Sequence, residues 1–153
     1  MNVRALTMSE CEAAGNIVGK NPLWRDRYGY DSEAAGRDLL YAVSHGDVVL
    51  GAFEGSQLCG FAWFIERGAF ARSPYLRLIA VDPTVQSRGV GAELLQAGEA
   101  LFRPKTKFMF LLVSDFNTRG HKFYRDQGYT QVGALADFVL PGVSELLFSK
   151  RLR

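Results

Sequence analysis

The chain has 153 residues, a length that suits one domain with one core, and its 48% hydrophobic and 22% charged residues are typical of a soluble globular protein. The formal net charge of +2 is too small and too scattered to indicate nucleic acid or an anionic membrane as the main partner. Two cysteines and two histidines, all far apart in the sequence, offer no metal-ligand spacing, so we expect no metal site.

The first part of the chain predicts one short strand and two helices. A strand covers residues 3–6, and a helix over 10–18 ends at Asn21-Pro22, because the residue before a proline disfavours helix. The second helix, over 33–44, begins at a cap supplied by Asp31 or Ser32. The aromatic and charged segment 23–30 between the helices fits no regular element.

The rest of the chain predicts strands that alternate with helices. A turn at 54–57 joins the first two strands, a loop covers 66–74, and the apolar run at 108–113 is typical of a strand covered on both faces. The predicted elements are strands over 48–53, 58–65 and 75–81, a helix over 90–102, a strand over 108–113, a helix over 118–127, and strands over 129–133 and 145–151.

This order of elements predicts a single mixed α/β domain over residues 1–153, because no linker, repeat or low-complexity tract interrupts it. The first residues lack the apolar run and cleavage site of a signal peptide, and no apolar stretch is long enough to span a membrane. We therefore expect a cytoplasmic protein without a membrane partner.

The strongest local signal is a glycine-containing loop between a strand and a helix, with the sequence Gln86-Ser87-Arg88-Gly89-Val90-Gly91. Gly89 and Gly91 leave room for a ligand against the backbone, and the first N–H groups of the helix have no intrahelical partners, so the loop suits a pyrophosphate. Arg88 adds a charge-assisted contact. On these residues alone, a tight turn without a ligand is an equally good interpretation. The loop lacks the spacing of a P-loop and the third glycine of a dinucleotide fold.

Two blocks of the sequence resemble the GNAT superfamily of N-acetyltransferases. Residues 76–92 are similar to its acetyl-CoA motif, [Gln/Arg]-x-x-Gly-x-[Gly/Ala] after a strand that ends in Val-x-Pro, with matches at Gln86, Gly89 and Gly91. Residues 117–129 are similar to its Asn-x-x-Ala-x-x-Phe-Tyr-x-x-x-Gly-Phe block, with matches at Asn117, Phe123, Tyr124 and Gly128. Gly120 stands where the family has alanine, and we expect it to weaken the helix by about 1 kcal/mol.

The resemblance implies a fold and a co-substrate. The fold is α/β, of the α+β type, with a central, mostly antiparallel sheet that contains a splayed pair of parallel strands, here 75–81 and 108–113, and is flanked by helices. The backbone of the first of these strands would bind the pantetheine arm of acetyl-CoA like an added strand. The cofactor-binding residues that we expect are Ile79, Ala80, Val81, Gln86, Ser87, Arg88, Gly89, Val90, Gly91, Ala92 and Asn117.

The resemblance also implies an enzyme that transfers acetyl from acetyl-CoA to a primary amine of a small molecule or peptide by direct attack. Tyr124 is the candidate general acid for the departing thiolate. A phenol of pKa about 10 protonates a thiolate of pKa about 8.5 only if its position or environment assists. The alternative roles are a core aromatic for Tyr124 and a helix cap for Asn117.

No residue is marked as the general base. Glu66 is the best candidate and Asp115 the second, with a solvated surface carboxylate as the alternative role of Glu66. His45 and His121 are less favoured. The acceptor pocket is expected from 23–30 and 66–74, where aromatic side chains suit cation–π contact with an amine or, equally, the core or a dimer contact: Trp24, Tyr28, Tyr30 and Phe70.

Three other functions stay open at this point. A regulatory domain would bind acyl-CoA without turnover, a structural module would use the glycine loop only as a turn, and an enzyme could use a different acyl-CoA. The oligomeric state is also open, and the resemblance favours a homodimer.

Overall fold

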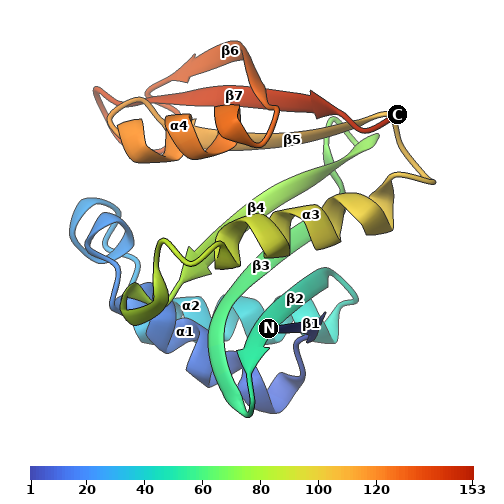
Figure 1. Ribbon diagram of the computed structural model, residues 1–153. Helices are drawn as coiled ribbons and strands as arrows, with labels where there is room; N and C mark the ends of the chain where they lie inside the picture. Colours follow the sequence, from blue (N-terminus) through green and yellow to red (C-terminus); the bar gives the residue numbers. More distant parts are fainter.

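A seven-stranded sheet forms the centre of the fold, and the computed structural model describes all 153 residues (Figure 1). The strand order is β1-β2-β3-β4-β5-β7-β6. The strands are β1 (Asn2–Ala5), β2 (Val48–Glu54), β3 (Gln57–Ala69), β4 (Ser73–Val81), β5 (Phe108–Ser114), β6 (Thr130–Ala136) and β7 (Ser144–Arg151). All neighbours are antiparallel except β4 and β5, which confirms the predicted mixed sheet with one parallel pair.

Four α-helices flank the sheet, namely α1 (Cys11–Gly19), α2 (Ser32–Ser44), α3 (Val90–Phe102) and α4 (Thr118–Asp126). The predicted cap of α2 is confirmed, because the Asp31 side chain accepts a hydrogen bond from the N–H of Ala34 at 2.9 Å. Gly128, at φ +95°, follows α4 in the left-handed conformation that ends helices. None of the helices is long and apolar enough to cross a membrane.

Two predicted segments differ from the structure. The expected loop at 66–74 is mostly strand, since β3 continues to Ala69 and β4 begins at Ser73, with Phe70 and Ala71 turning at positive φ. The unassigned segment contains one π-helical turn, η2 (Leu23–Arg27). Its periodicity could not be recognised because a single turn of that kind has no repeat along the sequence.

The two faces of the sheet carry different helices. Buried residues of α1 and α2 pack against one face of β2, β3 and β4, in a cluster that includes Leu39, Phe61 and Leu78. Buried residues of α3 and α4 pack against the other face, which extends across β5 and β7 to Phe148. Since no helix of the first pair reaches β5, β6 and β7, that half of the first face is left without a helical cover (Figure 1).

The apolar strand β5 is therefore covered less evenly than expected. Met109, Leu111 and Val113 are buried, whereas Phe110 and Leu112 are only half-buried on the opposite face. The prediction that both faces of β5 are fully covered was wrong, because the apolar side chains of its two faces have different surroundings. One face of β5 packs on the core, and the other lines a cavity.

A buried carboxylate fastens α3 to the C-terminal hairpin. Glu99 Oε2 accepts a hydrogen bond from Tyr129 Oη at 2.9 Å. Glu99 Oε1 forms an ion pair with Lys150 Nζ at 2.8 Å. Both oxygens of this buried side chain thus have partners, one of them a cation, as a charge removed from water requires.

Candidate active site

The only parallel pair of the sheet is also the pair that separates. β4 and β5 are paired at Tyr75–Phe110 and Leu76–Leu111 alone, and beyond these residues the two strands diverge. β4 carries an irregularity at this point, since the partners of Trp63 and Phe64 skip Arg77. A bulge of this kind bends a strand, which accounts for the divergence. The opening holds a cavity of about 1540 Å³.

One edge of β4 faces this opening without a strand partner. The N–H of Asp82 donates to the carbonyl of Cys59 on β3 at 2.8 Å. Because backbone groups alternate in direction along a strand, Ala80 also points its N–H and C=O toward β3, whereas those of Ile79 and Val81 point into the opening. An extended ligand can therefore pair with Ile79 and Val81 as an added strand would.

The loop after β4 presents a helix N-terminus to the same opening. Ser87 and Gly89 adopt positive φ angles of 69° and 82°, and the first hydrogen bond of α3 runs from Glu93 N–H to Gly89 C=O at 3.0 Å. The preceding N–H groups of α3 thus have no intrahelical acceptor. A Cβ on Gly89 would meet nothing within 4 Å, so this backbone is open to a ligand. The arrangement suits an anion such as a pyrophosphate.

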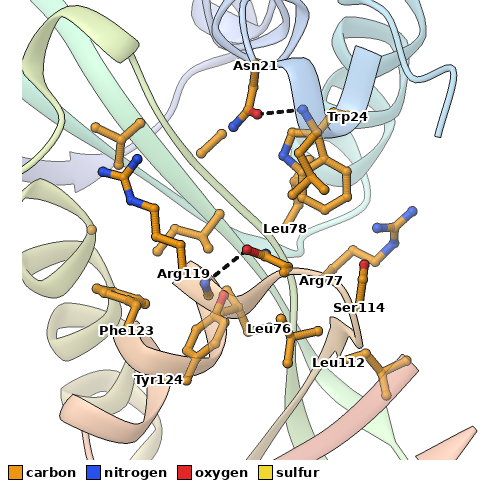
Figure 2. Close-up of a pocket in the computed structure, with 18 of the residues that line it drawn as sticks. Asn21, Trp24, Leu76, Arg77, Leu78, Leu112, Ser114, Arg119, Phe123 and Tyr124 are labelled. Carbon is orange, nitrogen blue, oxygen red and sulfur yellow. Dashed lines mark hydrogen bonds between the residues drawn. The ribbon is translucent and has the colours of Figure 1, made fainter. Parts of the chain in front are cut away.

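The cation that the sequence predicted for this loop is paired elsewhere. Arg88 pairs with Glu54 of the β2–β3 hairpin at 2.9 Å and does not line the cavity. Arg119 of α4 lines the cavity and has no acidic partner, and its side chain extends into the opening (Figure 2). The sequence did contain a signal for it, because Arg119 lies in the block that begins at Asn117. Its direction depends on how α4 is placed.

Tyr124 lies on the wall of the cavity opposite Trp24 and Asn21 (Figure 2). Its side chain is buried and packs edge-on against Phe123, with 5.1 Å between the ring centroids. This burial raises the pKa of the Tyr124 hydroxyl, and Tyr75 raises it to a smaller extent. The hydroxyl has no hydrogen-bond partner, yet no buried side-chain N or O atom in the protein lacks one. The Tyr124 hydroxyl is therefore open to the cavity.

Asn117 has both of the roles that the sequence left open. It caps α4, since its Oδ1 accepts the N–H of Gly120 at 2.9 Å, and it also lines the cavity. The predicted cofactor residues Ile79, Ala80, Val81, Gln86, Ser87, Gly89, Val90, Gly91 and Ala92 line it as well. Of the predicted cofactor-binding residues, only Arg88 does not.

The candidate bases lie elsewhere. Glu66 is paired with Lys105 at 3.1 Å beside a second, smaller pocket. Asp115 accepts the N–H of Ser144 at 3.0 Å outside the cavity lining. His45 is stacked on Tyr41, with 3.8 Å between the ring centroids, and His121 Nε2 is 2.8 Å from the carbonyl oxygen of Ser114. The structure thus brings none of these four side chains to the large cavity.

One half of the cavity lies on the face of β5 and β7 that neither α1 nor α2 covers. Phe110 and Leu112 of β5 and Leu147 of β7 form its floor. Aromatic and apolar side chains from other elements surround it, and they include all four that the sequence proposed, namely Trp24, Tyr28, Tyr30 and Phe70. An amine on an apolar body would find suitable surface here.

A polar cluster that the sequence gave no means of finding lies in this half. Tyr28 Oη donates to Glu145 Oε2 at 2.7 Å and is also hydrogen-bonded to Ser114 Oγ. Ser114 and Glu145 are cross-strand neighbours on β5 and β7, and both are buried. Burial raises the pKa of Tyr28 to about 12, with the carboxylate of Glu145 adding to the rise and the bond to Ser114 opposing it.

Comparison with known proteins gives consistent matches. The family model described as "Acetyltransferase (GNAT) family" matches residues 20–129. A putative acetyltransferase of the GNAT family from Desulfovibrio desulfuricans superposes with a TM-score of 0.86 at 18% identity, over 99% of each chain. The PaiA N-acetyltransferase of Thermoplasma acidophilum, in complex with coenzyme A, gives 0.76 at 21% identity over 98% of each chain.

A third structure is named for its acceptor. The ribosomal-protein-alanine N-acetyltransferase of Brucella melitensis gives a TM-score of 0.79 at 20% identity over 99% of each chain. No curated protein matches the sequence significantly.

Proposed function

Because this chain belongs to the acetyltransferase (GNAT) family, we propose that it transfers the acetyl group of acetyl-CoA to a primary amine of a small molecule or peptide. One observation carries the proposal. The divergence of β4 from β5 creates an opening in which an uncovered strand edge, a helix N-terminus and the unpartnered hydroxyl of Tyr124 lie on one cavity. These are the groups needed to hold an extended thioester with a pyrophosphate and to protonate its sulfur.

In this proposal the half of the cavity between β4 and the start of α3 binds acetyl-CoA. The backbone groups of Ile79 and Val81 pair with the amide groups of the pantetheine arm, and Ala80, paired with β3, contributes only to the wall. The N–H groups at the start of α3 bind the pyrophosphate. The lining residues Gln86, Ser87, Gly89, Val90, Gly91, Ala92 and Asn117 complete this half. We assign the phosphate-binding cation to Arg119 in place of Arg88, because Arg88 is turned toward Glu54.

Acetyl-CoA supplies an activated acetyl group and a thiol leaving group, and Tyr124 supplies the proton that the sulfur needs. Burial keeps the Tyr124 hydroxyl protonated because it raises the pKa of the phenol. The same burial would raise the pKa of a thiolate formed beside it, so the two pKa values move in the same direction. The proximity of the phenol and the sulfur in one cavity therefore provides the assistance that the ordinary pKa values lack.

The proposal also covers the extent of the catalytic domain and the class of acceptor. We propose that the whole chain, residues 1–153, acts as one catalytic domain, since one sheet contains strands from both ends of the chain. A peptide amine as acceptor is supported by the name of the Brucella enzyme, and a small-molecule amine suits the aromatic half of the cavity equally well. A cytoplasmic location and a homodimer stay predictions, the second of which light scattering would test.

The proposed function is tested by release of the coenzyme A thiol from acetyl-CoA in the presence of a panel of primary amines. Mass spectrometry of the acetylated amine separates transfer from hydrolysis. Amine-dependent thiol release with formation of the acetyl amide is the expected result. Binding of acetyl-CoA without turnover of any amine would instead favour a regulatory domain, and no binding would contradict the proposal.

A further inference from the structure

The half of the cavity beside β5 and β7, here called the acceptor half, contains a buried carboxylate that lacks a counter-charge. Glu145 is 7% exposed, lies at the start of β7 and lines the cavity. No Lys, Arg or His lies within ion-pair distance of it, whereas the other deeply buried glutamate, Glu99, is paired with Lys150. A buried charge without a partner is costly, and it therefore marks a place where a ligand is expected to bring the opposite charge.

One oxygen of Glu145 is fixed and the other is open. Oε2 accepts the hydrogen bond from Tyr28 at 2.7 Å, and Oε1 has no partner. Since no buried side-chain N or O atom in the protein is without a partner, Oε1 is reached from the cavity. Tyr28 thus holds the carboxylate in one orientation, with a free acceptor oxygen presented to whatever enters.

We infer that Glu145 binds the ammonium group of the acceptor through Oε1 and takes one of its protons, with Tyr28 and Ser114 as positioning residues. This inference rests on the proposed function. An ammonium must lose two protons to become an amide nitrogen. Glu145 accepts the first and releases it to solvent. The second leaves as nitrogen bonds to the acetyl carbon, while the C–S bond breaks and Tyr124 gives its proton to the sulfur. The second proton then restores the Tyr124 hydroxyl, so that one proton is released overall.

The charges around this site also define the class of acceptor. In the acceptor half the cation that lines the cavity without an acidic partner is Arg77, whose guanidinium lies 5.3 Å from the ring centre of Trp63. Arg27, which lies over the ring of Phe116 outside the cavity lining, also has no acidic partner. Burial raises the pKa of Tyr75, and to a smaller extent the charge of Arg77 lowers it and that of Glu145 raises it, so both charges act on the same region. The only other carboxylate that lines the cavity, Asp126, is paired with Lys122, so a second ammonium would find no free carboxylate in the lining and would be repelled by Arg77. The acceptor is therefore a monoamine on an apolar or aromatic body.

The first test compares Glu145→Gln with wild-type protein in two assays. Calorimetry with acetyl-CoA checks that the fold and the cofactor half are intact, and we expect a Kd within about threefold of wild type. Thiol release with the best amine of the panel should show kcat/KM reduced by about 100-fold, a typical loss for a missing base. The matched control is Glu12→Gln, an exposed carboxylate on α1 outside the cavity, and it should change neither value.

The second test separates proton removal from simple packing. Weakly basic amines, such as hydroxylamine or semicarbazide, reach the site already neutral, so they should lose about tenfold less activity than alkylamines in Glu145→Gln. The variant should also show kcat/KM rising with pH up to the pKa of the amine itself. The ionisable groups that face this site are Tyr28, Tyr75, Arg27 and Arg77, with Asp115 next to Ser114 and His121 against its carbonyl. The profile is therefore repeated in His121→Gln, which should match wild type.

If Glu145→Gln does not fold, Tyr28→Phe serves as the second variant. It keeps the ring and removes the hydroxyl that orients Oε2, so kcat/KM for the amine should fall by about tenfold at unchanged acetyl-CoA affinity. Among wild-type substrates, aromatic monoamines such as phenethylamine should exceed spermidine and an aminoglycoside by about tenfold or more.

Failure of the Glu145 inference can be distinguished from failure of the proposed function. Wild-type turnover in Glu145→Gln with every amine, or a preference for polyamines, would overturn the inference while the proposed function stands. Wild-type protein that neither binds nor consumes acetyl-CoA would overturn the proposed function and this inference together.

Discussion

The side chain of Asn117 occupies the space that a side chain on Gly120 would need. Its Oδ1 accepts the Gly120 N–H at 2.9 Å, and a Cβ on Gly120 would lie 2.6 Å from its Nδ2. The glycine therefore costs α4 some helix propensity but allows the Asn117 cap to close in its present form. Because Asn117 also lines the cavity, a change at Gly120 would affect a residue of the candidate active site.

A double-mutant cycle tests this coupling. In the wild-type background Gly120→Ala should change the free energy of unfolding by less than about 1 kcal/mol, since the gain in helix propensity is offset by damage to the cap. In an Asn117→Ala background the same change should stabilise the protein by about 1 kcal/mol. Urea unfolding measures both. Equal stabilisation in the two backgrounds would show that the cap adapts without cost.

Tyr124→Phe tests the general acid. The ring is retained and the open hydroxyl is lost, so kcat should fall by about 100-fold while the Kd for acetyl-CoA stays within a few-fold of wild type. The matched control is Tyr41→Phe, because Tyr41 is an exposed tyrosine of α2 outside the cavity, and it should be neutral. Wild-type turnover in Tyr124→Phe across pH would remove Tyr124 from the mechanism.

Arg119→Gln and Arg88→Gln form a direct comparison of the two candidate cations. Only Arg119 lines the cavity, so its variant should weaken acetyl-CoA binding by about tenfold, and Arg88→Gln should change it by less than about twofold. Calorimetry at two salt concentrations gives a further check, since wild-type binding should be more sensitive to salt than that of Arg119→Gln. The reverse order of the two variants would return the role to Arg88.

Acid should weaken the N-terminal part of the fold at Glu10. Hydrogen bonds from Arg4, at 2.7 and 3.0 Å, lower the pKa of Glu10 from 4.5 to about 2, although its own desolvation opposes the change. A carboxylate with a depressed pKa stabilises the fold above the unfolded pKa and loses that contribution as pH falls toward the folded value. Urea midpoints should therefore decrease between about pH 4.5 and pH 2 by less in Glu10→Gln than in wild type. Glu12→Gln, which has no such partner, should follow wild type.

The sequence predicted well what depends on neighbouring residues. The bounds of α3 match the predicted 90–102, because its apolar period, the glycine before it and the proline after it are all local signals. The glycine loop and the block around Tyr124 were recognised for the same reason. The extension of β3 to Ala69 was missed because it depends on pairing with Ser73, a contact that the charged residues before it do not indicate.

The parts of the site that were missed depend on the tertiary fold. Glu145 is 117 residues from Tyr28 in the sequence, and only the return of β7 beside β5 brings them together. Glu66 looked suitable as a base because it ends a predicted strand, but the longer β3 carries it to Lys105. The direction of an arginine is equally hard to read, since Arg88 could reach either the cavity or Glu54, and the hairpin offers the carboxylate.

The most direct test of the central claim is calorimetric titration of the protein with acetyl-CoA, with Gly89→Trp as the blocked variant. Gly46→Trp is the matched control, because Gly46 has a similar positive φ of 85° and open space but lies outside the cavity. The account predicts micromolar binding to wild type and Gly46→Trp, and its loss in Gly89→Trp. Equal binding by Gly89→Trp, or no binding by wild type, would contradict a coenzyme A site at the start of α3.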